Sequence, residues 1–144
     1  MPFATKTLAR DAILGLFTTA WVAQPPPVPL LLYDDVKQDT PKDGSPWARI
    51  QVKHNTGFQA TLSGETGNKR FTHEGLITVQ IFTKYGSGLK INDIHSQIAI
   101  EVFQGKRTAI EGVHFINVRS EEIGQSGDWY QTNVIAEFNY DTIK

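Results

Sequence analysis

The sequence predicts a single α+β domain, with two helices packed on one face of a mainly antiparallel sheet and a long projecting hairpin or loop. Three observations lead to this fold class. The 144 residues are enough to build one hydrophobic core. Apolar residues recur at helical spacing and then at strand spacing, and this order repeats in the second half. We find no internal repeat and no domain boundary, so residues 1–144 are expected to form one domain.

Two segments carry apolar residues at helical spacing. The first helix is predicted to begin near Thr5 or Thr7, either of which can cap it, and to end before the prolines at 25–27. The second is predicted to be capped by Ser87 and to end at Gly105. The expected buried stripes are Leu8, Ala12, Ile13, Leu16, Phe17 and Ala20 in the first helix, and Ile91, Ile94, Ile98 and Val102 in the second.

Strands are predicted wherever apolar and polar residues alternate or short apolar runs lie between turn residues. Turns are expected at Glu111-Gly112 and from Gly124 to Asp128. The first half of the 69–84 strand is polar and is expected to extend beyond the core. The predicted strands span 30–34, 47–54, 69–84, 108–110, 113–119 and 129–140.

The segment 55–68 differs from the rest of the chain. It is rich in glycine, serine and threonine, and its large apolar residues are Phe58 and Leu62. We interpret it as a long excursion, either a loose hairpin or a surface loop, that projects from the body. An exposed Phe58 or Leu62 would be costly without a partner. The functional hypothesis is an arm, including Lys69 and Arg70, that docks on a neighbouring subunit by strand addition; the alternative is a disordered surface loop.

A search for chemistry predicts no catalytic, cofactor or metal site. Cysteine is absent, which removes thiolate chemistry and cysteine zinc sites. The four histidines do not have the i, i+4 spacing of a helical metal pair, and His95 is interpreted as a packed core histidine. The net charge of -1 makes duplex binding by a monomer unexpected. No apolar run approaches the roughly 18 residues of a membrane span.

The order of these segments resembles a known family. An N-terminal helix leads through prolines to 33–36 (YDDV) and then to 46–52 (PWARIQV). A Gly/Thr-rich excursion follows, then 70–75 leading into 76–82 (LITVQIF), and 86–88 (GSG) opens a helix that ends at Val102-Phe103. This pattern covers nearly the whole chain. It is similar to the tail terminator, or tail completion, proteins of long-tailed bacteriophages, a group that includes small phage proteins of unknown function.

The resemblance implies a structural virion protein rather than an enzyme, without a cofactor and without a membrane partner. Such proteins form a homo-oligomeric ring, expected to be a hexamer, that caps the tail tube, stops its polymerisation and offers a surface to the head–tail connector protein. Genomic DNA passes through the lumen without specific binding, and Lys53 is a candidate lumen-facing residue. The expected location is the head-proximal end of the virion tail, after assembly in the host cytoplasm.

Three other interpretations stay open. The first keeps the phage setting and makes the protein a head–tail connector or neck protein, or a tail tube subunit. The second is a small hydrolase whose histidines and carboxylates meet only in the folded state. The third is a monomeric module that binds a small ligand.

Overall fold

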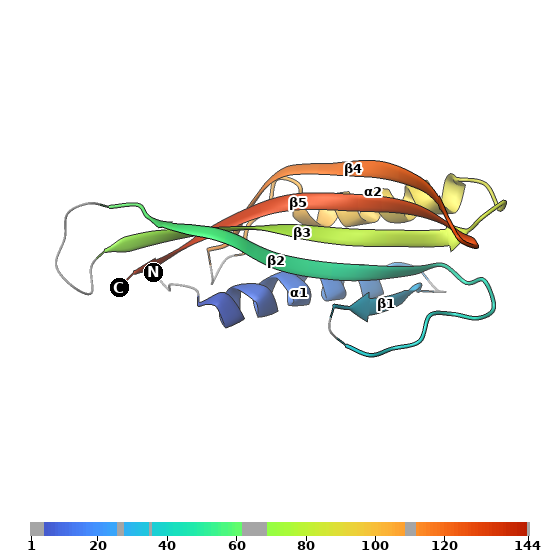
Figure 1. Cartoon of the computed structure of the whole chain (residues 1–144), viewed down its shortest axis with the longest axis horizontal. Coiled ribbons are helices and arrows are strands. Elements are labelled where there is room, and N and C mark those ends of the chain that lie inside the picture. The colour runs from blue at the N-terminus through green and yellow to red at the C-terminus, as the bar shows by residue number, and fades with distance from the viewer. Residues whose placement is uncertain (1–4, 26–27, 35, 62–68, 109–111, 144) are drawn as a thin grey trace.

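The computed structural model describes residues 5–25, 28–34, 36–61, 69–108 and 112–143. Helix α1 (Lys6–Val22) is followed by strands β1 (Leu30–Tyr33), β2 (Trp47–Gln59) and β3 (Arg70–Lys84). Helix α2 (Lys90–Phe103) precedes strands β4 (His114–Ser126) and β5 (Trp129–Ile143). The molecule is elongated, and its long strands run along the longest axis (Figure 1).

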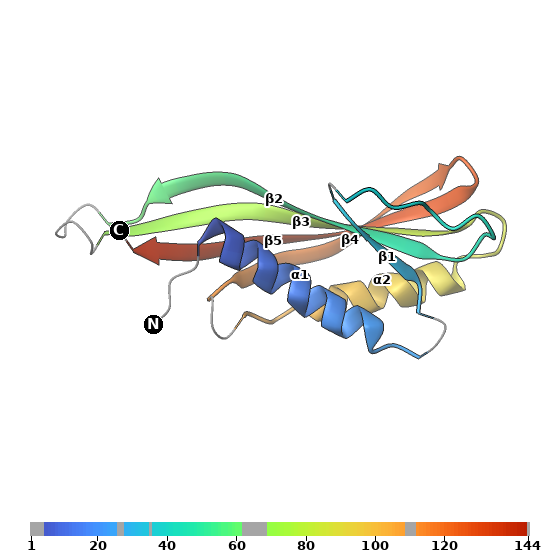
Figure 2. The same cartoon turned by 90° about the horizontal axis from the view of Figure 1, so that it is seen from below.

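The five strands form one sheet in the order β1-β2-β3-β5-β4. Every neighbouring pair is antiparallel except β1 and β2, which are parallel. Both helices cover the same face of this sheet, and no helix of the described residues lies on the other face (Figure 2). The predicted α+β class, with a mainly antiparallel sheet and helices on one face, is therefore confirmed.

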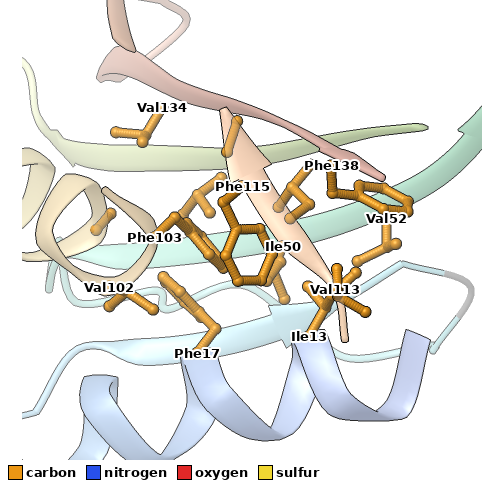
Figure 3. Close-up of a cluster of buried hydrophobic side chains, with 14 of the residues drawn as sticks. Ile13, Phe17, Ile50, Val52, Val102, Phe103, Val113, Phe115, Val134 and Phe138 are labelled. Atoms are coloured by element: carbon orange, nitrogen blue, oxygen red, sulfur yellow. The ribbon is translucent and has the colours of Figure 1, made fainter. Parts of the chain in front are cut away.

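The core lies between the helices and the sheet (Figure 3). Phe17 of α1 is its centre, with ring centroids 5.3 Å from Trp21 and 5.8 Å from Phe103 of α2. Phe103 in turn packs on Phe115 of β4, with the two ring centroids 5.0 Å apart. These large rings fix how both helices rest on the strands, because aromatic side chains bury the most area per residue. The sheet contributes Ile50, Val52, Ile77, Val79, Ile81, Val134, Ala136 and Phe138.

The predicted buried stripe of α1 is confirmed at Ile13 and Phe17 and is wrong at Leu8. In α1 the fully buried residues are Ala9, Ile13, Phe17 and Trp21, whereas Leu8 is 50% exposed. The stacked pair of Phe17 and Trp21 turns the helix so that Leu8 faces solvent. Thr5 caps the helix as predicted, since its hydroxyl accepts a hydrogen bond from the Leu8 amide at 3.2 Å.

In α2 the predicted residues Ile91 and Ile94 are each 46% exposed, and Asn92, His95 and Ser96 are buried in their place. Hydrogen bonds from Asn92 to the sheet hold this polar side of the helix inward. Ser87 is not the cap either. Its hydroxyl donates to the Lys84 carbonyl, and Leu89 is the N-cap residue.

The second half of the sheet is longer than predicted. β4 continues through Gly124 to Ser126, so the turn into β5 consists of Gly127 and Asp128. A register shift next to Gly124, whose φ is +100°, absorbs this glycine inside the strand. Of the predicted strand 108–110, residues 109 and 110 lie outside the described part of the chain, as does Glu111. Arg107 pairs with His114 as an isolated bridge.

Candidate assembly surface

A hairpin formed by the ends of β2 and β3 projects beyond the two helices (Figure 1). The predicted loose excursion is ordered strand for part of its length. β2 runs to Gln59 and pairs with β3 from Thr56↔Glu74 to Gln59↔Phe71. A register shift between His54 and Thr56 lets the pairing continue beyond the body, and β5 pairs with the far side of β3 as far as Arg70↔Ile143. We call residues 55–59 and 70–74 the projecting hairpin.

Phe58 is the exposed aromatic residue of this hairpin, with 51% of its surface accessible. It pairs with Thr72, so both side chains lie on the sheet face without helices. Arg70 lies two positions from Thr72 and shares that face. Its Nε is 3.8 Å from a carboxylate oxygen of Asp141, and both side chains are largely exposed, so the ion pair adds little stability.

The structure thus brings together two of the predicted interface residues, Phe58 and Arg70. Lys69 lies next to Arg70, half-buried, at the edge of the described chain. Lys53 is exposed on the same open face, but closer to the body, where it pairs with Leu76. Leu62 lies outside the described residues.

A polar cluster beneath the start of α1 anchors the base of the hairpin. The Arg10 Nη2 atom donates to the Val52 carbonyl at 3.2 Å and lies 3.5 Å from His54 Nδ1. The His54 ring meets Phe138 and Tyr140 edge-on, at 5.3 and 5.7 Å. Burial, and after it the positive charges of Arg10 and Lys6, lower the pKa of His54 from 6.5 to about 4. His54 is therefore neutral at physiological pH and acts as a packing group.

The open face of the sheet beyond this hairpin mixes polar and charged side chains. One row across four strands consists of Arg49, Gln80, Asn133 and Glu121. Trp47 stacks on Phe82 at 4.0 Å and meets Trp129 edge-on at 6.0 Å, and Arg49 lies 5.4 Å from the Trp47 ring centroid. These contacts form a second apolar cluster with Leu32 at one end of an otherwise polar face.

At the opposite end of the molecule is an apolar groove of about 870 Å³. We call it the α2 groove, because Ile91 and His95 of α2 form one wall. His95 is buried against Trp21 at 5.7 Å, as predicted, and burial lowers its pKa. Its buried Nδ1 atom has no hydrogen-bond partner among the described residues. The other lining residues are Val28, Pro29, Leu30, Asp39, Pro41, Lys42, Asp43, Ser45 and Pro46.

Sequence reasoning missed this groove. Its walls come from the start of β1, the 39–46 segment and α2, which are far apart in the sequence. The signal that could have found it is the prolines at 29, 41 and 46, which keep apolar surface outside regular structure. The stripe prediction hid it further by placing Ile91 in the core.

The described residues contain no group of three or more histidine, aspartate or glutamate side chains that could hold a metal ion. Neither helix, α1 nor α2, combines the length and the apolar character needed to cross a membrane.

No family model matches the sequence. No curated protein matches it either. Eighteen chains among the solved structures are similar. One of them, which carries only a sequence identifier as its name, superposes with a TM-score of 0.67 over 94% of this chain and 97% of that chain. The two sequences are 15% identical, so the likeness shows that they share the α+β fold and nothing more.

Proposed function

We propose that this protein is a tail terminator of a long-tailed bacteriophage, which assembles as a ring, expected to be a hexamer, on the end of the tail tube. The ring stops tube polymerisation and presents a surface for the head–tail connector. The observation that carries the proposal is the projecting hairpin. It extends beyond the helices and exposes Phe58, in a chain whose segment order resembles this family.

Two further features support an assembling protein. The surface keeps apolar side chains at both ends of the long axis, with Phe58 on the hairpin and Leu30 and Ile91 at the α2 groove. Such patches are unfavourable in water and mark contact surfaces. The outer strand β4 also offers a long sheet edge, and its register shifts near Ile116 and Glu122 limit indiscriminate pairing there.

The charge distribution supports passage of DNA rather than binding. The net charge is -1, and the open face carries both signs, with Arg49 and Lys53 on β2 and Glu121 and Glu137 on β4 and β5. A lumen of this composition would not hold a phosphate backbone, because binding needs a clear cationic excess. Within the proposal Lys53 is a lumen-facing residue and Phe58 with Arg70 forms the contact to a neighbour or the tube.

The test uses tail tubes of the cognate phage, polymerised in vitro with and without this protein. We expect shorter tubes of uniform length, each with extra ring density at one end in electron micrographs. Phe58→Asp should lose this capping. Leu8→Asp is the matched control, because Leu8 is 50% exposed on α1 and Phe58 is 51% exposed on the hairpin.

Other results of the tube experiment would indicate one of the alternative kinds of protein. Density along the whole tube would make the protein a tube subunit, and density between connector and tube without an effect on length would make it a neck protein. Turnover in a broad hydrolase screen, with no binding to tubes, would favour the enzyme. Each of these results would exclude the terminator.

A further inference from the structure

The α2 groove leaves apolar side chains exposed at one end of the molecule. Val28 is 38%, Leu30 41% and Ile91 46% exposed. These side chains converge from two segments, the start of β1 and α2, on one concavity of about 870 Å³. A concave apolar surface of this kind fits a convex apolar group of a partner.

We propose that the occupant is the projecting hairpin of a second copy of this chain, with its Phe58 ring seated between Leu30 and Ile91. The inference deepens the proposed function, on which it rests, by naming the surface that receives the hairpin. Phe58 is the exposed aromatic side chain of the hairpin, and aromatic residues in pockets dominate interface energetics.

The charges beside the two surfaces are complementary. Arg70 lies on the same face as Phe58, and its side chain is 51% exposed. Among the described residues its side chain makes one long ion-pair contact, 3.8 Å, to Asp141. The groove presents Asp39 and Asp43 with one cation, Lys42, and the neighbouring His95 is neutral, since burial lowers its pKa. A seated hairpin would therefore bring Arg70 to an acidic rim, which would fix the orientation of the contact.

The two surfaces lie at opposite ends of the longest axis, so they cannot meet within one chain (Figure 1). A contact between unlike surfaces of identical chains is heterologous. It continues from copy to copy, and it closes as a ring when the rotation between copies allows closure. The hairpin and the α2 groove thus supply the head-to-tail contact that a ring requires.

The test mixes two variants, Phe58→Asp and Ile91→Asp. Both positions are exposed, and an aspartate at 91 lies in the first turn of α2, where negative charge is tolerated. Each variant alone should stay monomeric in light scattering, with an association constant about thirty-fold or more below wild type. The mixture should form a one-to-one dimer that grows no further, because the Phe58→Asp copy keeps an intact groove and the Ile91→Asp copy keeps an intact hairpin.

A second measurement uses the absence of native cysteine. A mixture of Phe58→Cys and Ile91→Cys proteins should form a disulfide-linked heterodimer under mild oxidation at high concentration. Leu8→Cys in place of Ile91→Cys is the control, because its site is equally exposed but lies outside the groove.

The inference is overturned if either aspartate variant assembles like wild type, if the mixture stays monomeric, or if the control crosslinks as well as the Ile91→Cys protein. Tube capping separates these results from the wider proposal. If the protein caps tubes but fails the mixing test, the groove contact is wrong and the terminator function stands. If the variants form dimers in the mixing test but the protein does not cap tubes, the terminator function is wrong and the groove contact stands.

Discussion

Asn92 is the residue whose removal tests the packing of α2 most directly. It is 1% exposed, and its side chain makes three hydrogen bonds to the sheet. The Nδ2 group donates to Thr83 Oγ1 at 3.2 Å and to the Tyr130 carbonyl at 3.3 Å, while Oδ1 accepts from the Thr132 hydroxyl. Thr83 and Thr132 are themselves buried. The change Asn92→Ala therefore leaves several buried polar atoms without a partner.

The expected loss follows from these contacts. Three hydrogen bonds at about 1 kcal/mol each, with an added cost for unsatisfied buried groups, give about 3–4 kcal/mol of unfolding free energy. A typical domain has about 5–15 kcal/mol in total, so the variant should fold but be clearly weakened. Urea titration followed by tryptophan fluorescence measures this loss directly, because Trp21 reports on the main core and Trp47 with Trp129 on the cluster of the open face.

Ser96→Ala is the matched control. Ser96 is also buried on α2, but its hydroxyl donates within the helix, to the Asn92 carbonyl. Alanine restores helix propensity, so the expected change is below about 1 kcal/mol. In a double-mutant cycle with Thr132→Val, the combined loss should be smaller than the sum of the two, because both changes break the same bond. A loss below about 1 kcal/mol for Asn92→Ala, or equal losses for Asn92→Ala and Ser96→Ala, would refute the reasoning.

Two other predictions concern the body of the sheet. Because the folded-state pKa of His54 is lowered to about 4, the folded chain binds fewer protons than the unfolded one, and stability present above pH 6.5 is lost as the pH falls toward 4. The loss should approach about 1–3 kcal/mol after allowance for partial exposure, and urea titrations of His54→Phe should show a flatter pH dependence. A Cβ at Gly75 would overlap the Lys53 carbonyl oxygen and the Phe138 ring. Thermal unfolding should therefore show Gly75→Ala destabilised by at least about 2 kcal/mol, whereas Gly15→Ala, with open space on α1, gains about 0.5–1 kcal/mol; equal melting temperatures would contradict this.

The strands of the body could be predicted because their signal is local. In β2 the alternation of Ala48, Ile50 and Val52 with Arg49 and Gln51 matches the observed burial. Such a pattern depends only on which face meets the helices. The extension of β2 to Gln59 could not be predicted in this way, because its pairing depends on a register shift near His54 and on β3.

The buried face of the first half of α2 could not be predicted because tertiary contacts decide it. Apolar spacing favoured Ile91 and Ile94, yet Asn92 and Ser96 are buried, since the sheet offers Thr83 and Thr132 as partners. A buried polar group is stable only when such partners exist, and they come from distant parts of the chain. Because Asn92 and Ser96 face the sheet, Ile91 lies at the α2 groove. Placing Ile91 in the core therefore also hid this groove.

The strand pair β3–β5 connects the two ends of the molecule at which the candidate contact surfaces lie. β3 and β5 pair without a register shift from Arg70↔Ile143 to Lys84↔Trp129. This pairing runs from the hairpin at one end to the part of the sheet on which α2 packs, and so sets the angle between the hairpin and α2. In a heterologous assembly that angle determines whether successive copies close into a ring or continue as a filament. A hairpin on a flexible linker would allow several sizes, whereas this continuous pairing favours one closed size, which is what capping a tube of fixed diameter requires.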